Sequence, residues 1–381
     1  MSLYNPEDLS PLISSALVRV ERRLPRPGEI LVRLGARLEP EDVVGKAFLP
    51  APLCLFNVAQ KLGLAPNKVA RAMRFEVGNK VERGKEIAHT GLFGGRKFLA
   101  PATGVLAAID TVTGYVAIDP DPLSFELKAN LRGFVADLQP HEGVIIETLA
   151  SQVYGILGLG AERSGVLRLL VYDPAEVITH EQIDVKSTYA ILIGGAGITA
   201  QALRQAVKEQ VRGIIVGGIE EQELRAFLGW ANQSQWQTGI HSWRFPEMQH
   251  LADPGLTLVV TEGFGIHPMT KPIFDLLSSL DGQEALIEGL TSLQRPFRRP
   301  RVIIPQGRSS GGQVQPPPAT LRPGAQVRLL DTAHLGQVAR VRTLSAGPYR
   351  IVSGSRVLAV EVSQEAHPPF WVPQTAVEVL A

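Results

Sequence analysis

Three apolar runs, each ending in glycine and followed by a segment with helical spacing, constrain the fold of this chain most strongly. The runs span residues 188–195, 212–218 and 256–265. A continuously apolar strand is typical of a parallel sheet that is covered by helices on both faces. The sequence therefore predicts an α/β domain of flavodoxin-like or Rossmann-like type over residues 176–305, with a last short strand at 301–305.

The rest of the chain has a different pattern. Residues 28–175 alternate apolar residues with Gly- and Pro-containing turns, which predicts a β-rich region with a short helical insert near 56–73. Residues 1–27 are interpreted as a leader with a short helix. Residues 306–320 have the composition of a Pro/Gly linker, and residues 321–381 return to short strands. The predicted fold class is therefore multi-domain, α/β plus β.

A possible cofactor site follows the first apolar run. Gly195, Gly197 and Ala200 form a G-x-G-x-x-A motif between a strand and a helix, and Glu220 follows the next strand, where a ribose-binding acid would lie. The N-terminus of a helix stabilises phosphate. The hypothesis is a nucleotide or another phosphate-bearing cofactor, and the chain would then be an enzyme or a regulator of one. The alternative is that these glycines only allow strand-to-helix turns.

A second group of polar residues follows the third apolar run. Thr261, Glu262 and His267 are expected at the same sheet edge as Gly195 and Gly197, where open α/β sheets bind ligands. A Glu/His pair can transfer protons. The alternative is a hydrogen-bonded turn. Because no nucleophile with a suitably spaced base and no G-x-S-x-G motif accompanies the pair, no catalytic residue is assigned and an enzymatic role is not favoured.

Composition limits the compartment and the kinds of site. Cys54 is the only cysteine, which excludes an intrachain disulfide and a cysteine-based zinc site. No pair of histidines has helical ligand spacing, so no metal site is indicated. No apolar run reaches the roughly 18–20 residues of a membrane helix, and the start of the chain lacks a signal-peptide pattern. A cytoplasmic protein without membrane insertion is expected.

Basic residues are concentrated in one segment. Lys+Arg number 38 and Asp+Glu 37 over the whole chain, but residues 295–356 hold eleven arginines and one acid, Asp331, a local balance of +10. This asymmetry indicates a polyanionic partner, against the alternative of an ordinary solvated surface. The candidate contact residues are Arg298, Arg299, Arg301, Arg328, Arg340, Arg342 and Arg356.

The N-terminal strands resemble a known fold. Residues 77–88 (VGNKVERGKEIA) and 100–110 (APATGVLAAID) are similar to the barrel-sandwich hybrid of biotinyl and lipoyl carrier domains, and to N-terminal regions of Rnf- and Nqr-type redox-pump subunits. Residues 28–44 look like a second copy. The intervening turn at 92–95 has no lysine, and Lys97 is the nearest, so no covalent biotin or lipoate is expected. The resemblance implies a scaffold, on which other protein subunits could dock.

The C-terminal strands resemble a KOW module. The resemblance rests on residues 321–341 (LRPGAQVRLLDTAHLGQVARV), 353–362 (SGSRVLAVEV) and 370–380 (FWVPQTAVEVL). It implies an SH3-like barrel that contacts RNA or transcription or ribosomal proteins. Phe370 and Trp371 are expected either to stack on a base or to close the barrel core. The sequence thus predicts a non-enzymatic binding or assembly protein whose arginine-rich C-terminal module contacts RNA or an acidic protein.

Overall fold

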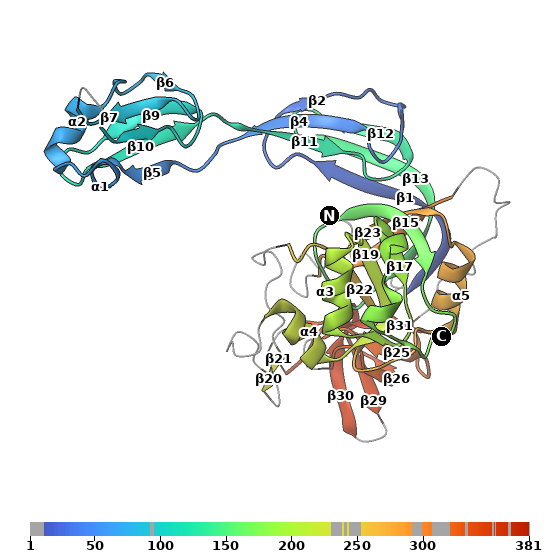
Figure 1. Ribbon diagram of the computed structural model, residues 1–381. Helices are drawn as coiled ribbons and strands as arrows, with labels where there is room; N and C mark the ends of the chain where they lie inside the picture. The colour runs from blue at the N-terminus through green and yellow to red at the C-terminus, as the bar shows by residue number, and fades with distance from the viewer. Residues whose placement is uncertain are drawn as a thin grey trace.

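The protein is built mostly from strands, which form 47% of the computed structural model, whereas helices form 15%. Figure 1 shows a body that contains the helices α3, α4 and α5, and an arm of strands that ends in a distal lobe. The structure describes residues 11–91, 95–229, 238–239, 242–243, 253–291, 299–306, 321–331, 334–352, 354, 356–364 and 367–380.

One mixed sheet forms the body. Its strands are β13 (Gly143–Tyr154), β14 (Leu157–Leu159), β15 (Arg163–Leu169), β17 (Ala190–Ile193), β19 (Gly213–Ile219), β22 (Thr257–Phe264), β23 (Glu284–Glu288) and β24 (Arg301–Pro305). The order is β14-β22-β19-β17-β15-β23-β24-β13, and the same sheet continues from β13 into the arm through three further strands. The four strands β15, β17, β19 and β22 are parallel, as expected for buried apolar runs, and the flanking strands are antiparallel.

This sheet begins earlier in the chain than expected. Residues 143–169 were assigned to the N-terminal β-rich region, but they supply three strands of the body sheet, and β15 pairs in parallel with β17. The difference arises because the pairing of a strand depends on partners far away in the chain, and the local spacing of apolar residues does not identify those partners. Between β15 and β17 lie β16 (Val177–Ile178) and the 3-10 turns η3 (His180–Gln182) and η4 (Val185–Ser187).

Three helices cover the sheet. They are α3 (Ala200–Lys208), α4 (Glu221–Leu228) and α5 (Lys271–Ser279). Helices α3 and α4 lie on one face and α5 on the other (Figure 1). Thr199 caps α3 by accepting a hydrogen bond from the backbone N–H of Ala202, and a proline in the first turn begins α5. Their apolar faces bury Leu203, Leu224 and Leu277 against the sheet.

A long strand connects the arm to the body. β1 (Leu12–Arg23) runs antiparallel to β13 over almost its whole length. Residues 1–27 were expected to contain a short helix, and residues 1–10 of this range lie outside the described ones. In β1, Val18 and Val20 are buried while Leu17 and Arg19 are exposed, which is the alternation of a strand. The other strands of the arm are β2 (Glu29–Ile30), β3 (Arg37–Leu38), β4 (Val43–Leu49), β11 (Leu123–Lys128) and β12 (Gly133–Gln139).

The distal lobe has its own core. Its strands are β5 (Cys54–Asn57), β6 (Lys80–Val81), β7 (Glu86–His89), β8 (Lys97–Leu99), β9 (Gly104–Ile109) and β10 (Tyr115–Pro120). Its helical segments are α1 (Val58–Leu62), the 3-10 turn η2 (Pro66–Lys68) and α2 (Val69–Ala72). Gly63 ends α1 in the left-handed conformation, with φ of 69°. The core contains Val58, Leu62, Val69 and Ile118, so the helical segments pack on the strands.

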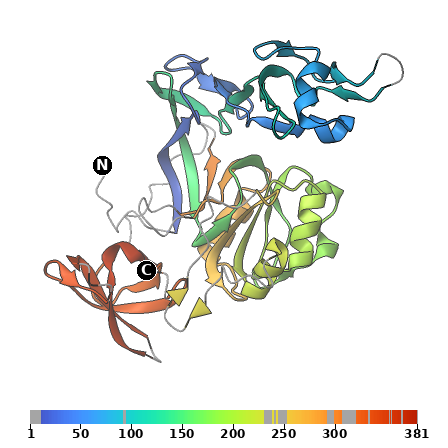
Figure 2. The same ribbon diagram turned by 90° about the vertical axis from the view of Figure 1, so that its left-hand side faces the viewer.

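The C-terminal segment forms a five-stranded antiparallel sheet. Its order is β30-β29-β26-β25-β31. The strands are β25 (Gln326–Leu329), β26 (Val338–Leu344), β29 (Ala359–Gln364), β30 (His367–Pro373) and β31 (Val377–Val379), and the hairpin strands β27 (Tyr349–Arg350) and β28 (Arg356–Val357) pair beside them. Remaining short elements are β18 (Gly197–Ile198), β20 (Thr238–Gly239), β21 (Ser242–Trp243) and η6 (Gln374–Ala376). Figure 2 shows this sheet on the side of the body away from the distal lobe.

Candidate nucleic-acid interface

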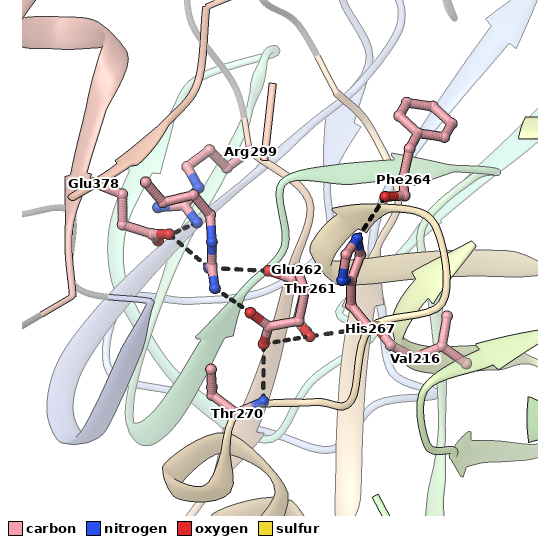
Figure 3. Close-up of polar contacts among 9 residues, drawn as sticks. Val216, Thr261, Glu262, Phe264, His267, Thr270, Arg299 and Glu378 are labelled. Atoms are coloured by element: carbon pink, nitrogen blue, oxygen red, sulfur yellow. Dashed lines mark hydrogen bonds and ion pairs between the residues drawn. The ribbon is translucent and has the colours of Figure 1, made fainter. Parts of the chain in front are cut away.

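Two of the predicted contact arginines are buried between the C-terminal sheet and the body (Figure 3). The side chain of Arg328, on β25, is 3% exposed, and that of Arg299, just before β24, is 4% exposed. Arg328 Nη1 donates to Glu378 Oε2 at 2.9 Å and to the carbonyl oxygen of Thr261 at 3.1 Å. Its Nη2 donates to the carboxylate of Glu262. Arg328 therefore connects Glu378 of the C-terminal sheet with Glu262 of the body.

The buried network is electrically balanced. Arg299 also pairs with the fully buried Glu378, and its Nε donates to the carbonyl oxygen of Gly155 at 3.0 Å. The charges of two arginines are thus compensated by those of Glu262 and Glu378, as buried charges require. Arg299 and Arg328 were predicted to contact a polyanion, and in the structure both guanidinium groups are enclosed and bonded within the chain.

Arg301 is also paired within the chain. It donates to both oxygens of Glu288 on the neighbouring strand, at 2.7 and 3.3 Å. Burial by itself lowers the pKa of Arg301, but the hydrogen bond and the charge of Glu288 outweigh burial and raise it above the ordinary value. In the folded protein, glutamates from outside residues 295–356 therefore compensate part of the positive charge of that segment.

A cavity lies beyond β22 and is lined by Glu262, His267 and Arg328, but the carboxylate of Glu262 is fully engaged within the chain. One carboxylate oxygen of Glu262 accepts hydrogen bonds from the backbone N–H of Thr270, at 3.0 Å, and from the hydroxyl of Thr261, at 3.2 Å. The other oxygen is bonded to Arg328. Glu262 is 7% exposed, so it is an anchoring group and not a base open to a substrate.

His267 lies apart from that carboxylate. Its Nε2 is 2.8 Å from the carbonyl oxygen of Phe264, three residues earlier, and its ring is exposed. Its backbone N–H donates to the carbonyl oxygen of Ala196 at 3.0 Å. The loop after β22 therefore lies beside the Gly195–Gly197 loop, as expected, but the Glu/His pair forms a hydrogen-bonded turn.

The predicted phosphate position is occupied by a carboxylate. The backbone N–H of Ala200, the first residue of α3, donates to Glu223 Oε2 at 2.6 Å. A Cβ atom on Gly195 would lie 2.3 Å from the carbonyl oxygen of Glu176, so this glycine permits close backbone packing. A phosphate at this helix end would meet the like charge of Glu223, which already accepts the hydrogen bond of Ala200.

Gly197 and Glu220 do not complete a ligand site. Gly197 is buried and pairs with Val177 in a short parallel ladder. Glu220 precedes α4, is exposed, and makes no capping hydrogen bond with its side chain. The positions of Gly195 and Gly197 fit the alternative in which these glycines only allow the turn between a strand and a helix.

The remaining predicted arginines share an exposed region of the C-terminal sheet. On β26, Arg340 and Arg342 are exposed, whereas Val341 between them is buried. A β-bulge at this point separates the pairing of Val341 from that of Thr343, and Arg342 lies 4.0 Å from the carboxylate of Glu361. Arg340 has no ion pair with any residue that the structure describes.

A hairpin extends the exposed region. Arg350 and Arg356 are exposed and lie opposite each other in the β27–β28 pair, where the described residues provide neither with a carboxylate partner. Tyr349, next to Arg350, stacks on Trp371 with ring centroids 4.2 Å apart and an interplanar angle of 23°. Trp371 is paired with Glu361 across β29 and β30. The hairpin therefore adds two exposed arginines, and Arg350 is next in the chain to Tyr349 of the aromatic pair.

The two adjacent aromatic residues have different roles. Phe370 packs against the core of the C-terminal sheet and stacks on His334 at 4.4 Å, whereas Trp371 stacks on Tyr349. Sequence reasoning missed Tyr349. The signal available was its place after the Gly347-Pro348 turn and beside Arg350.

Comparison with known proteins adds no assignment, because no family model and no curated protein matches the chain.

Three of the features expected from the sequence lie outside the described residues: Arg298, nearly all of the expected linker and most of the turn at 92–95. In the described part of the chain, no helix has the length and apolar character needed to cross a membrane. Within the same residues, no group of three or more His, Cys, Asp or Glu side chains is placed to hold a metal ion.

Proposed function

We propose that this chain is a non-enzymatic binding or assembly protein, and that its C-terminal sheet contacts single-stranded RNA. In this proposal the C-terminal sheet is a KOW-type SH3-like module, the arm and distal lobe are a barrel-sandwich-hybrid scaffold, and the body is a flavodoxin- or Rossmann-like domain. The protein acts in the cytoplasm, and transcription or ribosomal proteins are its expected neighbours.

The observation that carries the proposal is the set of four exposed arginines on β26 and the β27–β28 hairpin, together with the stacked Tyr349–Trp371 pair. Arginine forks suit phosphate oxygens, and an aromatic face can stack on a base. Arg340, Arg350 and Arg356 have no acidic partner among the described residues, and Arg342 is only weakly paired with Glu361 at 4.0 Å. We call Arg340, Arg342, Arg350, Arg356, Tyr349 and Trp371 the arginine face.

The test is the salt dependence of binding to poly(U) RNA. In the variant Arg340→Gln/Arg342→Gln/Arg356→Gln, we expect the plot of log affinity against log salt to be shallower by about 2, because each phosphate contact on a single strand contributes about 0.7. Trp371→Ala is expected to weaken binding by about 1–3 kcal/mol through lost stacking. Fluorescence anisotropy at several salt concentrations measures both effects.

The matched control removes three positive charges from the body, in Lys186→Gln/Lys208→Gln/Lys271→Gln. All three lysines are exposed and none lies on the C-terminal sheet. This control is expected to bind as the unchanged protein does. If both triple variants weaken binding equally, only the net charge matters and the proposed face is wrong.

A further inference from the structure

The helical end of the distal lobe carries a dense and uncompensated positive charge. Residues 58–74, from the start of α1 to just beyond α2, contain four basic residues and no acidic one. All four side chains are exposed: Lys61, Lys68, Arg71 and Arg74. The apolar residues of the same segment, among them Val58 and Val69, are buried in the lobe core. The segment therefore exposes its charged residues together with small or polar ones, and buries the larger apolar residues.

Arg96, just before β8, and Lys97, its first residue, add two more cations beside these helices. Arg96 lies against the end of α1, since a Cβ atom on Gly63 would be 2.8 Å from Arg96 Nη1. Lys97 and Arg74 both bind Glu86, at 2.9 and 2.7 Å. The hydrogen bond from Lys97 lowers the pKa of Glu86, so this carboxylate stays ionised, but it neutralises only one of its two partners.

The other lysines of the lobe are paired. Lys80 contacts Asp121 at 3.1 Å, and Lys85 contacts Glu82 at 2.8 Å. Arg83 is one further exposed cation of the lobe without a carboxylate partner among the described residues. The helical end holds six basic side chains and one carboxylate, a net charge of +5. We call this the distal patch: Lys61, Lys68, Arg71, Arg74, Arg96 and Lys97.

The composition of the patch points to a phosphate backbone and not to a protein. Protein-binding sites depend on apolar or aromatic anchors at their centre. Residues 58–74 have no large apolar side chain among the exposed ones of the described chain. Basic residues without such anchors suit the sequence-independent contacts that proteins make with phosphodiesters.

We infer that the distal patch is a second contact for the phosphate backbone of the nucleic acid that binds the arginine face. The choice of RNA as the ligand rests on the proposed function, whereas the existence of the positive patch follows from the structure alone. The distal lobe and the C-terminal sheet lie at opposite ends of the molecule in both views (Figures 1 and 2). One long strand could therefore engage both sites, and the second contact would then form within the complex and raise the overall affinity.

The experiment uses the full chain and long poly(U) RNA. The variant Lys68→Gln/Arg71→Gln removes two unpaired charges of the distal patch. Its log–log salt slope is expected to fall by about 1.4, which corresponds to two phosphate contacts at about 0.7 each. The matched control Lys80→Gln/Lys85→Gln removes two paired lysines from the same lobe, and it is expected to keep the original slope. Thermal unfolding of both variants verifies that the lobe remains folded.

The outcomes separate this inference from the proposed function. If the distal variant binds poly(U) with the unchanged slope while the arginine-face variant is impaired, the inference is overturned and the proposed function stands. If the distal variant is impaired and the arginine-face variant is not, the patch is a phosphate contact by itself, the proposed function fails, and the role of the patch as a second contact is overturned with it. A loss of binding to poly-glutamate without any loss toward RNA would assign the patch to an acidic protein and would also overturn the inference.

Discussion

At the residue scale, arginines of one segment have opposite roles. Arg328 and Arg340 are twelve residues apart in an arginine-rich stretch, yet the first is buried against two glutamates and the second is exposed. Burial decides the difference. A guanidinium removed from water needs carboxylate and carbonyl partners, and Arg328 has them from Thr261, Glu262 and Glu378.

Replacing Arg328 should strongly destabilise the protein. In Arg328→Met, Glu262 and Glu378 lose their shared cation while they remain buried, which typically costs about 3–5 kcal/mol. The free energy of unfolding from urea titrations measures the loss. The exposed Arg340→Met is the control, with an expected change within about 0.5 kcal/mol. A loss below about 1 kcal/mol for Arg328→Met would mean that the network does not hold the C-terminal sheet to the body.

At the scale of elements, the connection between β17 and α3 shows what the fingerprint glycines do. Gly195 packs against the backbone of Glu176, and Glu223 occupies the N-terminus of α3. Both contacts come from neighbouring segments of the same domain. The motif is therefore used for the internal packing of the domain, and its resemblance to a phosphate loop lies in the turn alone.

Two alanine substitutions test that conclusion. In Gly195→Ala the new methyl group would lie 2.3 Å from a carbonyl oxygen, so overpacking should cost about 1–3 kcal/mol. In Gly197→Ala the nearest atom would be 3.7 Å away, an ordinary contact, so a change of less than about 0.5 kcal/mol is expected. Thermal unfolding of the two variants compares them directly. Equal destabilisation would contradict the packing explanation.

At the scale of the whole molecule, the cores are separate but not equally independent. The distal lobe has a closed core of its own, which contains Val58 and Ile118. The arm core shares Leu286 and Ile303 with strands of the body. The C-terminal sheet is joined to the body by the buried charge network and by a small cluster that contains Ile156 and Leu330.

This arrangement predicts two units of unfolding. Amide hydrogen exchange followed by mass spectrometry should show the distal lobe opening independently, because its core shares no residue with the others. Peptides of β22 and β25 should exchange together, since breaking the contacts of Arg328 exposes both strands. If peptides of β25 exchange before those of β22, the C-terminal sheet detaches from the body by itself and the prediction is wrong.

The sequence by itself determined the local elements. The period of the apolar residues predicted the buried parallel strands and the helices between them. An uninterrupted apolar run can be identified from the sequence without knowledge of the strand that pairs with it. The turn glycines, the single cysteine and the two aromatic residues at 370–371 were also visible in the sequence. Each of these features depends on neighbours within a few positions of the chain.

Only the tertiary structure decided which residues meet. It placed β15 in the body sheet, it paired Arg328 with Glu262 and Glu378, and it brought Tyr349 against Trp371. It also brought Arg96, just before β8, beside the end of α1, which completes the distal patch. The physical reason is that the energy of an ion pair or a stack depends on separations of a few ångströms between side chains far apart in the chain. Spacing along the sequence contains no record of those separations.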